Sequence, residues 1–240
     1  MNVAHFRSSN KQQATTDTWA EALALSSLLH RVVALEVMSM SDAKEDLQHL
    51  FSYYYEHNSW GSQESKSGPG STVYESKELI HELPKLLQCL AVKTILDAPC
   101  GDFNWMKEVN LDSYEYIGVD IVADCIRDNQ SRYQKSSIQF LEKDIVHDTL
   151  PKADLILCRD GLVHFPNPMV KEAIENFKRS GSTYLLTTHF PNTVVNNDIA
   201  IGDWRPINFT LPPFNFEDPM FMIKETLPIK TMALWKLDHL

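Results

Sequence analysis

The stretch VKTILDAPCGDFNW, residues 92–105, decides the fold of this chain. It opens with a short apolar run rich in β-branched residues, which is typical of a strand buried in a parallel sheet. The run ends at Asp97, after which Pro99 and Gly101 break the strand and let backbone approach a ligand closely. Asp102 then begins a predicted helix, because a carboxylate is favourable near a helix N-terminus. This succession predicts a nucleotide-type site in a doubly wound sheet, although no complete GxGxxG fingerprint for a dinucleotide is present.

Two further predicted strands each lead to a carboxylate. Residues 115–120, EYIGVD, end in Asp120, at the distance from the glycine turn where doubly wound nucleotide sites place a ribose-binding acid. Residues 137–142 form the third strand, and Asp144 follows it. Because parallel strands of such a sheet end at one edge, these two acids and Asp97 are predicted to converge. An edge lined by acids suits hydroxyls, amines and cations better than bare phosphates.

The rest of the chain continues the α/β alternation and then leaves it. The fold class is therefore α/β: a Rossmann-like, doubly wound, mostly parallel sheet with a C-terminal antiparallel hairpin and an N-terminal helical extension. The remaining predicted elements are strands at 153–158 and 182–188, helices at 121–133 and 168–178, and a closing hairpin of 221–224 with 232–237.

The N-terminal part of the chain has a different sequence pattern, with two predicted helices and a long polar loop. Residues 18–37 and 41–55 have helical spacing of apolar side chains, with Ser41 as a candidate N-cap. The glycine- and serine-rich residues 58–71 are predicted to be a loop that covers the site as a lid, with a passive linker as the alternative. Trp60, in the middle of this loop, argues against plain disorder and is assigned to substrate binding.

Two local signals frame the next helix. Thr72 and Glu75 form a plausible capping box at its start. Pro84 is predicted to kink or restart the helix before Leu90. Much later, the Pro-rich residues 190–219 are predicted to form a loop or cap over the active edge of the sheet.

Bulk properties narrow the class of protein. The chain has 240 residues, a hydrophobic fraction of 43% and a formal net charge of −10, which suits one domain and disfavours broad nucleic-acid binding. Its four cysteines contain no CxxC pair, so reduced thiols are expected and a metal site is not. No apolar signal core or membrane-spanning run is present, so a soluble cytoplasmic protein without membrane contact is predicted.

At this point the sequence resembles class I S-adenosylmethionine-dependent methyltransferases. LDAPCGDF matches the first motif of that superfamily, YIGVD the second, EKDI the third and ADLILCRDGLVHF the fourth. Within the superfamily the chain is similar to a group whose signature pieces appear here as WGSQESKSGPGS, DAPCGDFNWM, YIGVDIV, CRDGLVH, TTHF and GDWRPIN. The resemblance covers about residues 55–225 and departs from the usual glycine pattern at Pro99 and Cys100. We accordingly divide the chain into N-terminal helices and a lid loop (1–71) and a methyltransferase domain (72–240).

The resemblance implies S-adenosyl-L-methionine as cofactor and suggests what each acid does. Asp97 should act on the ammonium group, Asp120 on the ribose hydroxyls and Asp144 on the adenine amino group. Cys158 and Arg159 should pass beside the sulfonium, whereas Trp105 is more typical of a core residue. The full cofactor-binding set is Asp97, Pro99, Gly101, Trp105, Asp120, Ile121, Asp144, Ile145, Cys158 and Arg159.

Transfer to a hydroxyl group also needs a base near the leaving proton. The candidates just past the strand ends are His164, His189 and Asp160, of which His164 has a suitable ordinary pKa. Each has a structural alternative: a packed or capping histidine, or an ion pair of Asp160 with its neighbour. Trp204 and Arg205 are the candidate acceptor wall, the latter able to meet an anionic group bidentately or to form a plain surface ion pair.

Three functions remain open at this point. The leading one is methyl transfer to a small-molecule or glycan-like acceptor at oxygen, by a protein that forms a homodimer or acts alone. The second is a nitrogen or protein methyltransferase, although CRDG stands where a DPPY-type motif for amine methylation is expected. The third is a binding or scaffold protein that retains the fold without turnover.

Overall fold

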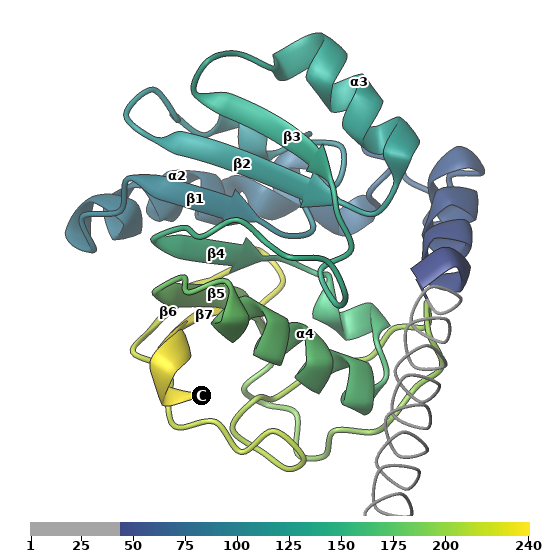
Figure 1. Cartoon of the computed structure of the whole chain (residues 1–240). Coiled ribbons are helices and arrows are strands. Elements are labelled where there is room, and N and C mark those ends of the chain that lie inside the picture. Colours follow the sequence, from purple (N-terminus) through teal and green to yellow (C-terminus); the bar gives the residue numbers. More distant parts are fainter. Residues whose placement is uncertain (1–43) are drawn as a thin grey trace, which may run out of the picture. The chain divides into compact units, whose positions relative to one another are not determined.

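The computed structural model describes residues 44–240, and Asp46–Leu240 form one compact unit (Figure 1). The predicted helix at 18–37 and the cap at Ser41 lie outside the described residues. Residues 44–56 are helical, as predicted for this part of the chain, and are called the covering helix below. Among the described residues, no helix combines the length and the apolar character that a transmembrane span requires.

The sheet confirms the predicted fold class. Its strand order is β3-β2-β1-β4-β5-β7-β6, in which the first five are parallel and β7 runs antiparallel between β5 and β6. The order in which successive strands are added to the sheet reverses between β1 and β4, the point at which doubly wound sheets bind ligands. The strands are β1 Thr94–Asp97, β2 Glu115–Asp120, β3 Ile138–Glu142, β4 Leu155–Cys158, β5 Tyr184–His189, β6 Phe221–Lys224 and β7 Thr231–Lys236.

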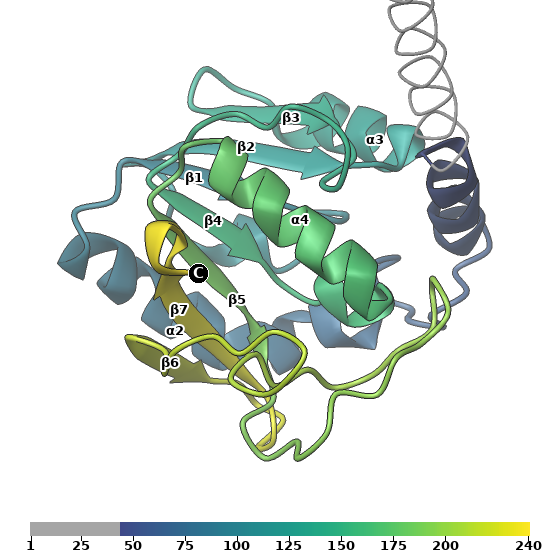
Figure 2. The ribbon, with the colours of Figure 1, turned by 60° about the horizontal axis from the view of Figure 1, so that its bottom comes forward.

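Helices cover both faces of the sheet. The helices α2 (Val73–Cys89) and α3 (Ala123–Tyr133) pack their apolar side chains on one face. The helix α4 (Asn167–Arg179) packs on the other, so that Figure 2 shows α4 in front of the sheet and α2 behind it. The described part also contains short 3-10 helices at Pro69–Ser71, Met106–Glu108, Leu162–His164 and Leu237–His239.

One local prediction was wrong. No α-helix begins at Asp102: the chain turns instead, with Phe103 at a left-handed φ of 57°, and only the short Met106–Glu108 helix follows. The carboxylate of Asp102 accepts hydrogen bonds from the N–H of Lys66 (2.8 Å) and the hydroxyl of Ser65 (2.9 Å), and so anchors the loop of residues 58–71. We call this segment the lid loop.

Pro84 does not restart its helix, because α2 runs without interruption from Val73 to Cys89. Its buried leucines hold the helix against the sheet on both sides of the proline. At the start of the helix, the hydroxyl of Thr72 accepts a hydrogen bond from the N–H of Glu75 at 3.3 Å, which is one half of the predicted capping box.

Candidate active site

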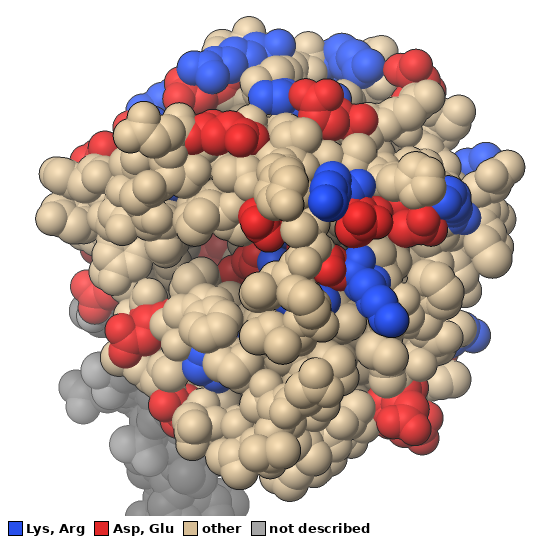
Figure 3. All heavy atoms as spheres, turned by 180° about the vertical axis from the view of Figure 1, so that it is seen from behind, with Lys and Arg blue, Asp and Glu red and all other residues tan. Residues whose placement is uncertain are grey.

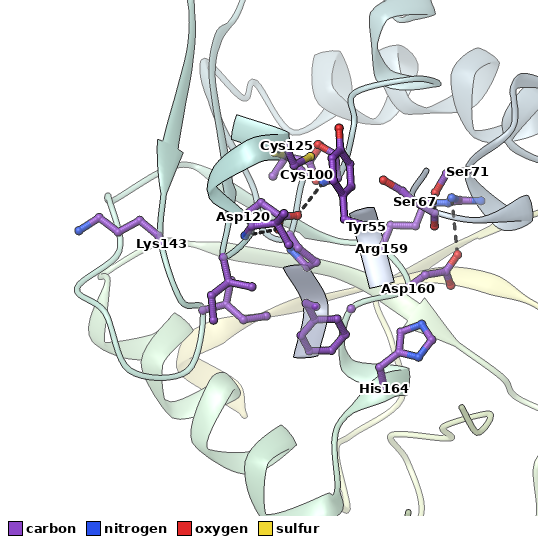
Figure 4. A pocket seen from close by; sticks show the side chains of 18 of the residues that line it. Tyr55, Ser67, Ser71, Cys100, Asp120, Cys125, Lys143, Arg159, Asp160 and His164 are labelled. Atoms are coloured by element: carbon purple, nitrogen blue, oxygen red, sulfur yellow. Dashed lines mark hydrogen bonds and ion pairs between the residues drawn. The ribbon is translucent and has the colours of Figure 1, made fainter. Parts of the chain in front are cut away.

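A crevice opens at the carboxyl edge of the sheet (Figure 4). Pairing of Asp97 with Gly118 and of Asp120 with Glu142 brings the ends of β1, β2 and β3 to this edge, as predicted. The covering helix and the lid loop form the opposite wall. Of the residues predicted to bind cofactor or substrate or to act in catalysis, the crevice is lined by Trp60, Asp97, Pro99, Gly101, Trp105, Asp120, Ile121, Asp144, Ile145, Arg159, Asp160 and His164.

The first two acids are buried carboxylates held by nearby donors. Asp97 accepts a hydrogen bond from the hydroxyl of Tyr116 at 2.7 Å, and burial raises its pKa to about 7. Asp120 accepts from the N–H groups of Gly101 and Val122, each at 3.0 Å, and burial raises its pKa to about 6. A cationic ligand in the crevice would therefore find two carboxylates whose charge its own charge stabilises.

The third acid, Asp144, is bound mostly by its own turn. Its oxygens meet the N–H of Val146 at 2.8 Å and the ring of His147 at 2.5 Å, and its side chain is 1% exposed. It lines the crevice beside Ile145. Each carboxylate oxygen has two lone pairs, so these bonds leave acceptor capacity for a ligand amino group.

The other half of the edge carries a buried ion cluster. Arg159 donates to Glu225 from two nitrogens, at 2.5 and 3.3 Å, and to the carbonyl of Gly70 in the lid loop at 2.8 Å. Its guanidinium also lies 5.3 Å from the ring centroid of Trp105. Arg159 thus ties the lid loop to the turn between β6 and β7.

Asp160 belongs to the same cluster and, like Arg159, lines the crevice (Figure 4). Lys230 donates to one of its oxygens at 2.5 Å and Thr188 to the other at 3.1 Å. Burial raises its pKa, but the charges of Lys230 and Arg159 outweigh this and lower the pKa to about 2. The side chain is therefore an anion at neutral pH. The lid loop approaches it closely at Gly70, where a Cβ would lie only 3.2 Å from the carboxylate.

His164 points into the crevice on the side of Asp160 (Figure 4). Its Nδ1 lies 2.9 Å from the main-chain carbonyl of Asp203, which can only accept, so Nδ1 carries the proton. No residue of the described chain bonds to Nε2. Burial lowers the pKa of the imidazole, so the ring is neutral at pH 7 and Nε2 is free to take a proton. The ring of Trp60 lies beside it, with 5.8 Å between centroids.

Two predicted residues lie away from the crevice. His189 is 2% exposed and packs against Phe209 and Trp235, where its Nδ1 accepts the N–H of Phe209 at 3.3 Å. Burial lowers its pKa to about 4, so it is a neutral core histidine. Cys158 is fully buried in the core cluster that includes the apolar side chains of α4, and it does not line the crevice.

The predicted acceptor wall of Trp204 and Arg205 is also corrected. Trp204 is 53% exposed and packs edge-on against Phe190 rather than lining the crevice. Arg205 is 4% exposed, and its guanidinium donates to the main-chain carbonyls of Leu162 (3.1 Å) and Phe165 (2.7 Å). It therefore has no fork of donors left for an anionic acceptor. No residue of the Pro-rich segment 190–219 lines the crevice.

The sequence reasoning missed the wall contributed by the covering helix. Leu47, Phe51 and Tyr55 line the crevice, and their spacing of four residues was a signal that they share one helix face. Gln48 on the same helix donates to the carbonyl of Ile121 at 3.1 Å, which fixes the helix over the end of β2. The other missed lining residues are Ser67, Ser71, Cys100, Val122, Cys125, Lys143, Gly161 and Phe165.

Comparison with known proteins identifies this arrangement. A family model described as a methyltransferase domain matches residues 95–181. PigF with bound S-adenosylhomocysteine is similar at 14% identity and a TM-score of 0.50, over 65% of this chain and 60% of that one. Human N-acetylserotonin methyltransferase with S-adenosylmethionine has 15% identity, coverages of 71% and 60%, and a TM-score of 0.49.

A third solved structure, magnesium protoporphyrin IX methyltransferase from Synechocystis PCC 6803 with S-adenosylmethionine, has 12% identity and a TM-score of 0.48. The match covers 67% of this chain and 80% of that one. The chain thus spans about 60% of the other two neighbours, and no curated protein matches it. At these identities the structural likeness shows the fold alone.

The family match makes residues 95–181 part of a methyltransferase domain. The sheet order and the acid-lined switch point agree with the class I S-adenosylmethionine-dependent enzymes that the sequence resembles. An enzyme of this class takes its methyl group from S-adenosyl-L-methionine.

Proposed function

We propose that this enzyme transfers the methyl group to a hydroxyl oxygen of a small-molecule or glycan-like acceptor, with His164 as general base. The observation that carries the proposal is the state of that histidine. It is neutral, its proton is held on Nδ1 by the carbonyl of Asp203, and its free Nε2 faces the crevice. Such a ring can take the proton of an acceptor hydroxyl as the carbon–oxygen bond forms.

The cofactor fits the first half of the crevice on chemical grounds. Asp120 would hold the ribose hydroxyls, and Asp97, beside Gly101, would face the ammonium group. Asp144 would accept from the adenine amino group, while Ile121 offers an apolar surface to the ring. The sulfonium supplies the reactive carbon, so these residues have only to bind, orient and exclude water.

Asp160 supports the same proposal from the second half. Its carboxylate is ionised and faces the crevice, and it is close enough to His164 to favour the imidazolium that forms when the ring takes a proton. In this proposal Asp160 both forms an ion pair and assists catalysis, because its bond to Lys230 holds the carboxylate in place. The bond that orients His164 comes from a main-chain carbonyl instead.

The charge distribution supports a small acceptor over nucleic acid. On the face seen in Figure 3, basic and acidic side chains are interspersed among uncharged ones. The free base favours oxygen over the nitrogen or protein acceptors of the second function. Division of the chain at residue 71, a cytoplasmic location and homodimer formation stay predictions.

Calorimetric titration with S-adenosylhomocysteine tests the cofactor half. Asp120→Ala should weaken binding by about 100-fold, because charged hydrogen bonds to the ribose contribute roughly 1.5–3 kcal/mol each. The matched control is Asp112→Ala, whose side chain is 82% exposed and outside the crevice, and it should bind like the wild type. Equal affinities in both variants would overturn the cofactor assignment, and no binding to the wild type would favour a scaffold.

A further inference from the structure

We propose that residues 202–205, Gly-Asp-Trp-Arg, form a clamp that positions His164 and fixes which of its nitrogens carries the proton. The clamp rests on the proposed function, since it explains how the base is held. These residues belong to the sequence piece GDWRPIN, and none of them lines the crevice. They therefore act through His164 and not on the acceptor.

The main chain of the clamp brackets the histidine on three sides. The N–H of Gly202 donates to the carbonyl of His164 at 2.9 Å, and the N–H of Arg205 donates to the carbonyl of Val163 at 3.2 Å. Between these two bonds, the carbonyl of Asp203 accepts the Nδ1 proton of the ring at 2.9 Å. The backbone and the side chain of His164 are thus held by one short segment about 40 residues away in the sequence.

Arg205 strengthens the clamp from beneath. Its guanidinium donates to the carbonyls of Leu162 and Phe165, the residues on either side of the Val163–His164 pair, and to the side chain of Asn167 at 3.0 Å. Burial lowers its pKa only to about 10, so the group is charged and its hydrogen bonds are charge-assisted. Lysine could not span these acceptors with one ammonium group.

Gly202 closes the clamp against the covering helix. Its φ is +87°, and a Cβ there would lie 2.9 Å from the hydroxyl of Tyr54 and 3.0 Å from Leu50. Because this left-handed φ is strained for any residue with a side chain, a substitution here should distort the turn and shift the carbonyl of Asp203. The glycine is therefore needed both for its backbone conformation and for close approach.

Nuclear magnetic resonance of histidine-ring nitrogens tests the clamp on the full chain, with the His164 signal assigned by its loss in His164→Gln. In the wild type at pH 7.5, Nδ1 should carry the proton and Nε2 should not. Arg205→Lys should mix the two tautomers and lower kcat by roughly 10-fold to 100-fold, because small misplacements of a catalytic group are costly. The affinity for S-adenosylhomocysteine should stay within about twofold, as no clamp residue touches the crevice.

The controls separate positioning from general damage. Arg179→Lys, at an exposed position in the last turn of α4, should leave both the spectrum and kcat unchanged. If Arg205→Lys does not fold, Gly202→Ala provides the second variant and should mix the tautomers in the same way. A proton on Nε2 in the wild type, or an unchanged spectrum in the folded clamp variants, would overturn the inference. Suppose that the wild type shows the expected tautomer and that His164→Gln keeps full activity. This result would overturn the proposed function and leave the clamp standing.

Discussion

The two halves of the crevice are built in different ways. In the cofactor half, Asp120 bonds to Val122 and Asp144 bonds to Val146, in each case two residues along the chain. In the acceptor half, the bonds join residues far apart in sequence: Arg159 to Glu225 across 66 residues, and Asp160 to Lys230 across 70. The first half is held by local turns and by two bonds from β1 or the turn after it to the neighbouring strand β2, each joining residues 19 apart in sequence. The second half joins segments that are much farther apart and exists only once the whole sheet has formed.

This difference teaches which half tolerates change. A local turn can form its bonds whatever happens elsewhere, so a substitution there should affect mainly the ligand that it binds. A long-range cluster joins β4, the lid loop and the turn between β6 and β7, so a substitution there should affect stability as well. The following predictions test this contrast.

The largest effect is expected at His164. His164→Gln should lower kcat by roughly 10²-fold to 10⁴-fold, the usual contribution of a general base, and leave cofactor affinity unchanged. The matched control is His189→Gln. Its kcat should stay within about threefold of the wild-type value, because the side chain of His189 lies in the core. Labelled-methyl transfer into extract, followed by mass spectrometry of the product, supplies the acceptor for this assay. Equal losses in the two variants would remove His164 from its role.

The next effect concerns stability. Glu225→Gln removes the buried carboxylate charge that Arg159 and Lys230 share, so the free energy of unfolding should fall by about 3–5 kcal/mol. Glu175→Gln breaks the exposed pair with Lys178, whose partners are 58% and 27% exposed, and should cost less than about 1 kcal/mol. Urea denaturation of both variants measures the difference. Similar midpoints would mean that the cluster does not hold the acceptor half together.

A smaller effect is expected from pH on cofactor binding. The pKa values of Asp97 and Asp120 are raised by burial to about 7 and about 6, and a cationic ligand favours their ionised forms. Affinity for S-adenosylmethionine should therefore rise between pH 6 and 7.5, by roughly five- to tenfold from Asp97 alone. Calorimetry across this range checks the sign, and Asp97→Asn should flatten the curve. Tighter binding at lower pH would contradict the assignment.

The smallest effect tests a local bond outside the crevice. Thr72→Ala removes the side-chain cap of α2 and should lower the free energy of unfolding by about 1 kcal/mol, without changing cofactor affinity. Thermal denaturation with and without S-adenosylhomocysteine measures both quantities. A loss as large as that of Glu225→Gln would erase the distinction between local and long-range bonds.

The same distinction explains what the sequence could predict. The strands and the acids at their ends were predictable because a strand pattern and the residue after it are local features, as EYIGVD and Asp120 illustrate. The helix expected at Asp102 failed for the opposite reason. Its carboxylate binds the lid loop, about 36 residues earlier in the chain, and no local pattern reveals that partner.

The acceptor half was predicted only in part. His164 and Asp160 were found because they follow a strand end, but the roles of their partners depend on contacts made by distant segments. Arg205 was expected to meet a ligand. The local sequence of an arginine next to a tryptophan is the same whether its side chain faces a ligand or main-chain carbonyls. Only the fold decides between the two, and it places the guanidinium beneath His164.

The most direct test of the central claim is a crystal structure of the full chain with S-adenosylhomocysteine. The two-half account predicts the ribose hydroxyls within hydrogen-bonding distance of the Asp120 carboxylate, and the sulfur directed toward the side of the crevice that holds Asp160 and His164. A ligand bound elsewhere, or one whose sulfur points away from His164, would contradict it.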